Sequence, residues 1–224
     1  MKRASLLLGI AFVAFVILSQ TGAEATNRSF EQRFAASSAV GDSGVYNFDK
    51  AHSFIGFKVK HMGLVEVPGF FRDFTGTVNY DAKDVTKSTV EFTAKATSVD
   101  TGVAPRDNHL RSKDFFEVEK FADITFKSTK VKKTGKGLLL TGDFTMKGVT
   151  KSITFPFEIA GWLAGSDKSA PKMGIVAETT INRRDYGVNY GSNMPNGVPV
   201  LSDNIKIVLQ IEANGSKPTA DSVK

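Results

Sequence analysis

Residues 55–61 read IGFKVKH and set the pattern that dominates this chain of 224 residues. Ile55, Phe57 and Val59 occupy every second position, and Lys58 and Lys60 stand between them. Side chains of a β-strand point alternately to its two faces, so a period of two indicates a strand with one apolar face and one polar face.

The same alternation recurs along the chain and predicts nine strands. Short polar turns, such as DAKD at 81–84 and TGKG at 134–137, separate several of them. The apolar positions that mark the strands are Tyr46/Phe48, Ile55/Phe57/Val59/His61, Phe70/Phe74/Val78/Tyr80, Val90/Phe92/Ala94/Ala96, Ile124/Phe126, Leu138/Leu140/Phe144/Met146, Ile153/Phe155/Phe157/Ile159, Met173/Ile175/Ala177/Ile181 and Ile205/Ile207/Leu209/Ile211. Such a chain predicts an all-β fold, an antiparallel up-and-down β-barrel of about eight strands.

One segment interrupts the strand pattern. Residues 101–116 read TGVAPRDNHLRSKDFF and gather charged side chains into a short run that ends on two phenylalanines. Pro105 suits the first turn of a helix, and Asp100 or Thr101 could cap it. We therefore expect one short helical insert in the barrel.

This segment resembles the RD-x-HL-x-S-x-DFF signature of the YceI-like family of periplasmic lipid-binding proteins. Three further stretches resemble the family in the same order: 49–63 (DKAHSFIGFKVKHMG), 140–151 (LTGDFTMKGVTK) and 181–187 (INRRDYG). The resemblance implies a lipocalin-like barrel that holds a polyisoprenoid or another long-chain lipid, such as a prenylated quinone. It also implies a binding protein without a cofactor, rather than an enzyme.

The N-terminus has the features of an export signal. Lys2 and Arg3 precede an apolar run from 6 to 18, and Ala-Glu-Ala at 23–25 offers a cleavage site. We expect a signal peptide at 1–25 and a periplasmic mature protein. A linker at 26–43, the barrel at 44–213 and a disordered tail at 214–224 complete the expected organisation.

Composition excludes several functions. The chain has no cysteine, which rules out a lipoprotein anchor, disulfides, thiol catalysis and cysteine-ligated metals. Its formal charge of +6 is scattered along the strands rather than clustered, unlike a nucleic-acid site. We expect no nucleic-acid partner, and a mild attraction to anionic lipid headgroups that favours peripheral membrane contact.

The apolar faces are rich in aromatic residues, with 18 Phe and one Trp in the chain. These rings could fill a barrel core or surround a ligand, and the residues alone leave both options open. Small residues assigned to the inner faces favour a narrow tunnel: Gly56, Gly76, Ala94, Gly142 and Ala177. With the resemblance added, the expected ligand-binding residues are Phe57, Val59, His61, Phe74, Val78, Phe92, Phe126, Leu140, Phe144, Phe155, Phe157 and Ile175.

Polar candidates for chemistry are few. His52 and His61 have opposite parity in a strand, and no H-x-H or H-x-x-x-H spacing occurs, so we expect no metal site. Arg106, Asp107 and His109 could be catalytic or could tie the helix to the barrel, and the lack of a nucleophile motif favours the structural role. The candidate headgroup residues are Arg106, His109 and Arg183.

The leading interpretation is a periplasmic carrier that holds an isoprenoid-type lipid in an apolar cavity. Three alternatives remain at this point. The first is an outer-membrane β-barrel, since alternation does not say which face points inward. The second is an enzyme that acts on a hydrophobic substrate at the barrel mouth. The third is a structural domain with a filled core.

Overall fold

A computed structural model gives the structure of the protein and describes residues 41–216. The expected signal peptide, most of the expected linker and residues 217–224 lie outside the described residues. The strands are β1 (Gly44–Phe48), β2 (Phe54–His61), β3 (Val65–Phe71), β4 (Phe74–Tyr80), β5 (Thr89–Lys95), β6 (Val99–Asp100), β7 (Asp123–Thr134), β8 (Gly137–Met146), β9 (Val149–Leu163), β10 (Lys172–Asn182) and β11 (Leu201–Gly215). One α-helix, α2 (Ala104–Arg111), and the 3-10 turns η1 (Val85–Lys87), η2 (Ala96–Ser98) and η3 (Arg183–Tyr186) complete the described part.

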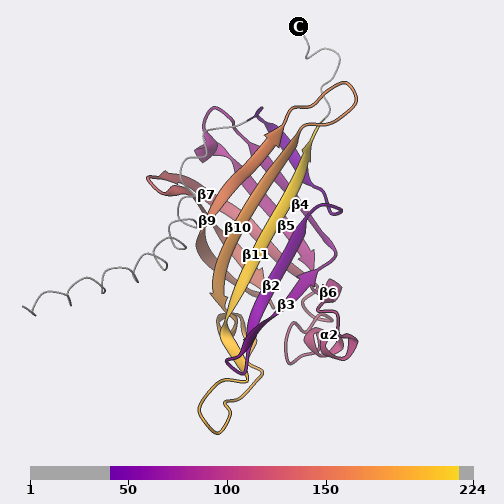
Figure 1. Cartoon of the computed structure of the whole chain (residues 1–224), viewed down its shortest axis with the longest axis vertical. Helices are drawn as coiled ribbons and strands as arrows, with labels where there is room; N and C mark the ends of the chain where they lie inside the picture. Colours follow the sequence, from indigo (N-terminus) through magenta and orange to yellow (C-terminus); the bar gives the residue numbers. More distant parts are fainter. Residues whose placement is uncertain (1–40, 217–224) are drawn as a thin grey trace, which may run out of the picture.

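Eight antiparallel strands form a closed barrel in the order β1-β4-β5-β7-β8-β9-β10-β11, and β11 pairs with β1 to complete the ring. The long strand β11 pairs with β1 through its last residues and with β2 through its first ten. Strands β2, β3 and β6 therefore extend the sheet at one end of the barrel (Figure 1). The predicted all-β, antiparallel barrel with one helix is confirmed.

At that same end, the ladder between β5 and β7 stops and the chain after β5 leaves the barrel. Strands β5 and β7 pair only between Glu91 and Lys95 on one side and Asp123 and Lys127 on the other. After a last backbone hydrogen bond from Ala96 to Ala122, β6 leaves to pair with β3. Residues 101–121, including α2, lie at this end of the barrel beside β3 and β6 (Figure 1).

The apolar face of the strands points into the barrel. Buried residues of one parity, such as Phe126, Leu140 and Phe155, form a single core. The opposite parity carries ion pairs, among them Lys95–Asp123 at 2.8 Å. A barrel embedded in a bilayer needs an apolar outer band, so this outer face does not fit the outer-membrane alternative.

The expected strand through Phe70 and Phe74 is wrong, because a bend at residues 72–73 divides it into β3 and β4. The parity changes at the bend. Phe71 points inward, with its ring 5.8 Å from that of Phe57. Phe70 packs on Phe54 at 5.2 Å instead. Two adjacent phenylalanines hide the parity in the sequence, since either ring could continue the alternation.

The glycines do not enlarge a tunnel as expected. Gly56 has the parity of Phe54, opposite to that of the inward Ile55 and Phe57, so its Cβ direction points to the outer face, although the residue borders the larger of two internal cavities. At each of three glycines a Cβ would meet an aromatic ring at 2.4 Å: Phe54 for Gly56, Phe48 for Gly76 and Phe126 for Gly142. These glycines make room for rings. Ala94 and Ala177 do line internal cavities.

The helix begins later than its expected cap. Val103 occupies the N-cap position of α2, and Pro105 lies in the first turn as predicted. Thr101 is held by Asp107 instead of capping the helix. At the other end of the chain, β11 continues to Gly215, two residues beyond the expected end of the barrel. Within residues 41–216, no helix has the length and hydropathy needed to cross a membrane.

Candidate functional site

A cavity of about 390 Å³ lies inside the barrel at the end that carries α2. This volume falls in the range of about 300–1,000 Å³ typical of small-molecule sites. Strands β2 and β3 form one wall, the inner faces of β5, β7, β8, β10 and β11 form much of the remainder, and the helical insert and the loop between η3 and β11 complete it. The apolar part of the wall includes Ile55, Phe57, Val59, Val67, Phe71, Phe92, Leu110, Phe115, Phe116, Ile124, Phe144, Ile181, Val188, Val200, Leu201, Ile205 and Ile207.

A second, smaller cavity of about 60 Å³ continues the apolar interior. Its walls come mainly from β4, β5 and β7 to β11, with Phe48 of β1, Ile55 of β2 and Val85 of η1. Ile55 and Phe92 line both cavities, so the two spaces are neighbours within the barrel. A flexible apolar chain that filled both would have to pass these two side chains.

The structure places nearly all the expected ligand-binding residues on these walls. Those on the larger cavity are Phe57, Val59, His61, Phe92 and Phe144. Those on the smaller cavity are Val78, Phe92, Phe126, Leu140, Phe155, Phe157 and Ile175. Phe74 lines neither of them, although it is buried in the core.

Arg106 and Asp107 organise the start of the helical insert. The buried carboxylate of Asp107 accepts hydrogen bonds from the backbone N–H of Thr101, at 2.9 Å, and from its hydroxyl. Arg106 donates to the Thr101 hydroxyl and carbonyl oxygen at 2.7 and 2.9 Å. Both side chains thus fix the turn before α2, while the exposed guanidinium of Arg106 also borders the larger cavity.

His109 stands at the cavity mouth within a cluster of rings. Its Nε2 lies 2.9 Å from the carboxylate of Asp114. The imidazole meets Tyr190 edge-on at 4.7 Å between ring centroids and Phe115 at 5.0 Å. Since Tyr190 belongs to the loop between η3 and β11, this cluster joins that loop to the helical insert across the mouth.

Arg183 is buried, and its guanidinium N–H groups form hydrogen bonds with other residues of the protein. It donates to the carbonyl oxygens of Val188 at 2.8 Å and Ser202 at 3.0 Å, and to the carboxylate of Asp203 at 3.0 Å. Burial lowers the pKa of this guanidinium from its ordinary value, while the charge of Asp203 opposes that change. These contacts make Arg183 an anchor for the loop at the cavity mouth.

The insert and the following loop supply wall residues that parity could not reveal. Leu110, Phe115 and Phe116 come from 101–121, and Val188 and Tyr190 come from the loop after η3. Neither segment shows the alternation of apolar and polar residues that identifies the inward side chains of a strand. The pair Phe115-Phe116 at the end of a charged run was the one available signal.

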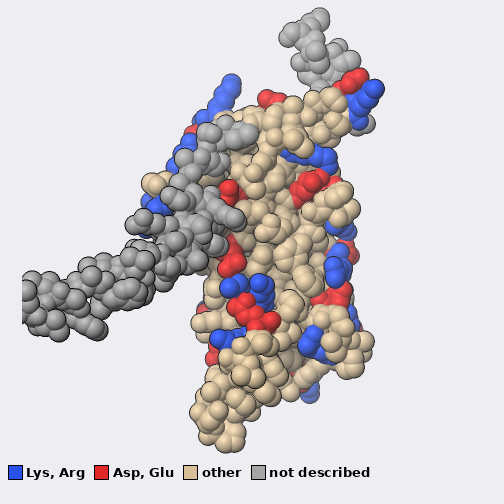
Figure 2. All heavy atoms as spheres, in the orientation of Figure 1, with Lys and Arg blue, Asp and Glu red and all other residues tan. Residues whose placement is uncertain are grey.

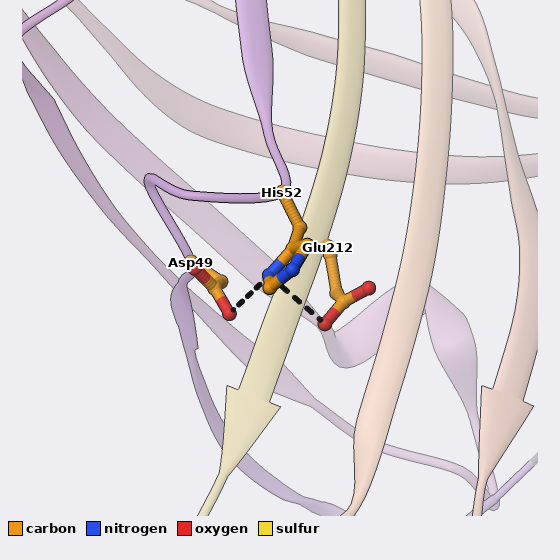
Figure 3. Close-up of side chains that lie close together, drawn as sticks. All are labelled: Asp49, His52 and Glu212. Carbon is orange, nitrogen blue, oxygen red and sulfur yellow. Dashed lines mark hydrogen bonds and ion pairs between the residues drawn. The ribbon is translucent and has the colours of Figure 1, made fainter.

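A separate cluster of polar side chains lies on the outside of β11. Figure 3 shows His52 between Asp49 and Glu212, with its Nδ1 3.0 Å from an oxygen of Asp49 and 3.9 Å from one of Glu212. These are metal-ligating types, and the three ligand atoms lie within 4.8 Å of one another. However, Lys172 binds the same oxygen of Glu212, and Asn214 donates to Asp49 at 3.1 Å. The cluster is better explained as a network that ties the β1–β2 connection to β11.

A closed antiparallel barrel with an apolar interior and a helical cover defines a lipocalin-like barrel protein. Within that class the chain belongs to the YceI-like family, because the model of the YceI-like domain matches residues 46–213. Protein YceI of Escherichia coli O17:K52:H18 is 37% identical over 182 residues, which cover 80% of this chain and 90% of that protein. The resemblance inferred from the sequence is confirmed.

Two solved structures share the fold. Burkholderia cenocepacia BcnA has a TM-score of 0.66 at 22% identity, covering 75% of this chain and 99% of its own. A domain from Saccharophagus degradans, described as a polyisoprenoid binding domain, has a TM-score of 0.59 at 15% identity and covers 78% of this chain and all of its own. At these identities the likeness concerns the fold alone.

Proposed function

We propose that this protein binds a long-chain isoprenoid-type lipid, a prenylated quinone among the candidates, and carries it through the periplasm. The observation that carries the proposal is the apolar cavity of about 390 Å³ enclosed by the barrel and its helical cover. Membership of the YceI-like family and the polyisoprenoid binding domain with the same fold support it. The export signal expected at residues 1–25 supports the location.

Burial of an aliphatic chain supplies the affinity. Each methylene moved from water to an apolar wall contributes about 0.8 kcal/mol, so ten contribute on the order of 8 kcal/mol before ordering losses. Phe92 and Ile55 separate the larger cavity from the smaller one. In this proposal the chain runs inward past these residues toward the smaller cavity.

The polar end of the lipid remains at the mouth. Arg106 and His109 border the larger cavity there. Arg106 keeps guanidinium N–H groups beyond the two bonds to Thr101, and these groups suit an anionic or carbonyl oxygen. Arg183 contributes indirectly, by holding the loop that forms the rim.

Binding without turnover fits the polar contacts at the mouth. The Asp107 carboxylate is engaged by Thr101, and the His109 imidazole faces Asp114. Each side chain of the cluster is therefore accounted for by a bond that shapes the insert. An enzyme at this mouth would lose turnover of a hydrophobic substrate in the His109→Ala variant, whereas a carrier has no turnover to lose.

The test fills the larger cavity. Ala94 is fully buried on its wall, so Ala94→Phe places a ring in the space that the lipid would occupy. Thr93→Phe adds the same ring to the opposite face of β5 and serves as the matched control. Mass spectrometry of organic extracts should find lipid in the wild type and in Thr93→Phe, and little in Ala94→Phe. Equal lipid content in a folded Ala94→Phe protein would contradict the proposal.

A further inference from the structure

Exposed apolar side chains gather at the end of the barrel where the larger cavity opens. Leu64, in the turn between β2 and β3, and Val65, the first residue of β3, are 76% and 61% exposed. Met62, Val103 and Tyr190 are exposed at the same end. Tyr190 also lines the cavity, so this apolar surface continues into the cavity wall.

Two neighbouring segments at this end of the barrel carry no Lys, Arg, Asp or Glu. They are residues 61–65 (HMGLV) and 186–202 (YGVNYGSNMPNGVPVLS). A backbone hydrogen bond of 2.9 Å from Met62 to Val200 joins the two segments, which we call the tip. In Figure 2 the lowest part of the molecule is uniformly tan, and the blue and red spheres begin above it.

Two cations without an ion pair in 41–216 lie near the tip. Lys60 and Arg106 are exposed and form no ion pair with any residue in 41–216. By contrast, the nearby carboxylates have partners: Asp107 accepts from Thr101, and Asp114 faces His109. Glu66 faces both Lys58 at 3.9 Å and Lys206 at 3.5 Å. Asp203 is shared by two guanidinium groups, at 3.0 and 2.7 Å.

We propose that the tip docks onto the surface of an anionic lipid bilayer and places the cavity mouth against it. Apolar side chains of surface-bound proteins enter the headgroup boundary to a depth of about 5–10 Å, and a charge-free tip removes the main cost of that entry. Lys60 and Arg106 behind it match anionic headgroups. This inference rests on the proposed function, since it names the membrane as the source and destination of the lipid.

Leu64→Asp tests the docking, and Leu163→Asp is its control. Leu163 is 66% exposed and ends β9 at the opposite end of the barrel. Flotation with phosphatidylcholine vesicles, with and without phosphatidylglycerol, measures the partition of each protein. We expect wild type and Leu163→Asp to bind the anionic vesicles equally and Leu64→Asp to bind at least about tenfold more weakly, the effect of losing one buried leucine.

Other results would overturn the docking. Equal losses of vesicle binding in Leu64→Asp and Leu163→Asp would overturn it. Wild-type protein that does not float with the anionic vesicles would also overturn it. Light scattering that shows a wild-type dimer converted to monomer by Leu64→Asp would also overturn it, because the tip would then contact a second copy.

Lipid content, measured separately by mass spectrometry, distinguishes failure of the membrane docking from failure of the proposed carrier function. Wild-type protein that contains lipid but ignores vesicles refutes the docking alone. Protein that binds vesicles through Leu64 but contains no lipid supports the docking and refutes the carrier.

Discussion

Phe92 and Phe126 stack inside the barrel with ring centroids 5.8 Å apart and planes inclined by 22°. Phe126 lies on the wall of the smaller cavity, and Phe92 lies on the walls of both. The stacked pair therefore stands where the two spaces meet, and its size sets the room between them.

Removing the Phe92 ring should join the cavities. We expect Phe92→Ala to lower the free energy of unfolding by about 3 kcal/mol, as for other large-to-small changes in a core. It should also shift the bound lipids toward longer chains, measured by mass spectrometry after exposure to a mixture of chain lengths. Phe157→Ala is the control, because Phe157 lines only the smaller cavity. A similar shift in both variants would argue against a dividing role for Phe92.

Gly142 should not tolerate a side chain. A Cβ at this position would lie 2.4 Å from the Phe126 ring and 2.5 Å from the carbonyl oxygen of Lys127, which belongs to the backbone and cannot move easily. We expect Gly142→Ala to lower the free energy of unfolding by about 1–3 kcal/mol in denaturant titrations. Gly161→Ala, in β9 with no atom within 4 Å of its Cβ position, should leave stability unchanged or slightly higher. Equal effects at the two glycines would show that the contact with Phe126 is unimportant.

Arg183 and Arg184 both bind the carboxylate of Asp203, but we expect them to contribute differently to stability. Arg183 is buried and binds Val188, Ser202 and Asp203, whereas Arg184 is 41% exposed in its side chain. Arg183→Met should cost about 2–3 kcal/mol, because bonds to a charged group are lost and two carbonyl oxygens lose their donor. Arg184→Met should cost under about 1 kcal/mol, as for exposed ion pairs. Thermal unfolding of the two variants decides, and similar costs would contradict the anchoring role of Arg183.

Asp49 should stabilise the fold in a pH-dependent way. Hydrogen bonds from His52, Asn214 and the backbone of Ala51 lower its pKa from 3.8 to about 2. A carboxyl group with a depressed pKa contributes stability that is present above its unfolded pKa and is lost as the pH falls through the folded value. Asp49→Asn should therefore melt below wild type at neutral pH, and the difference should close between about pH 4 and pH 2.

The control for this pH dependence is Asp167→Asn. Asp167 is exposed in the β9–β10 loop and forms no hydrogen bond or ion pair with the described part of the chain. Its melting temperature should follow that of wild type over the whole range. A gap for Asp49→Asn that stays constant down to pH 2 would mean that the lost interaction is not the ionised carboxylate.

Strand parity was enough to predict the barrel and most of its interior. Ile55, Phe92 and Leu140 follow a period of two within single strands, and one buried face fixes their orientation. The parity failed at Phe70 and Phe71, where adjacent identical residues concealed a bend. The assignment of Gly56 to the inner face ran against this same parity, which puts it on the outer face with Phe54 and Lys58.

The mouth of the cavity was less accessible to prediction. Arg106 and His109 were expected to lie near it, but their partners depend on how distant segments meet. Tyr190 reaches His109 only because the loop after η3 folds over the helical insert, 81 residues away in the sequence. Arg183 lies on the wall of the larger cavity, where a headgroup candidate was expected, but no local pattern could show that its guanidinium would also donate to Val188 and Ser202.

Residues 103–121 cover one end of the barrel without joining its strand ladders. Outside α2, the backbone hydrogen bonds of residues 103–121 have both ends within that segment. The segment is fastened to the sheet by side chains, such as Arg111 on Thr97 and Lys147 on Lys113. Its detachment would break no strand ladder, but it would expose Phe115 and Val118, which are buried in the core. The eight-stranded ring closes without this segment. We therefore expect the cover to open at a lower free energy than global unfolding, so that loading of a long lipid need not unfold the barrel.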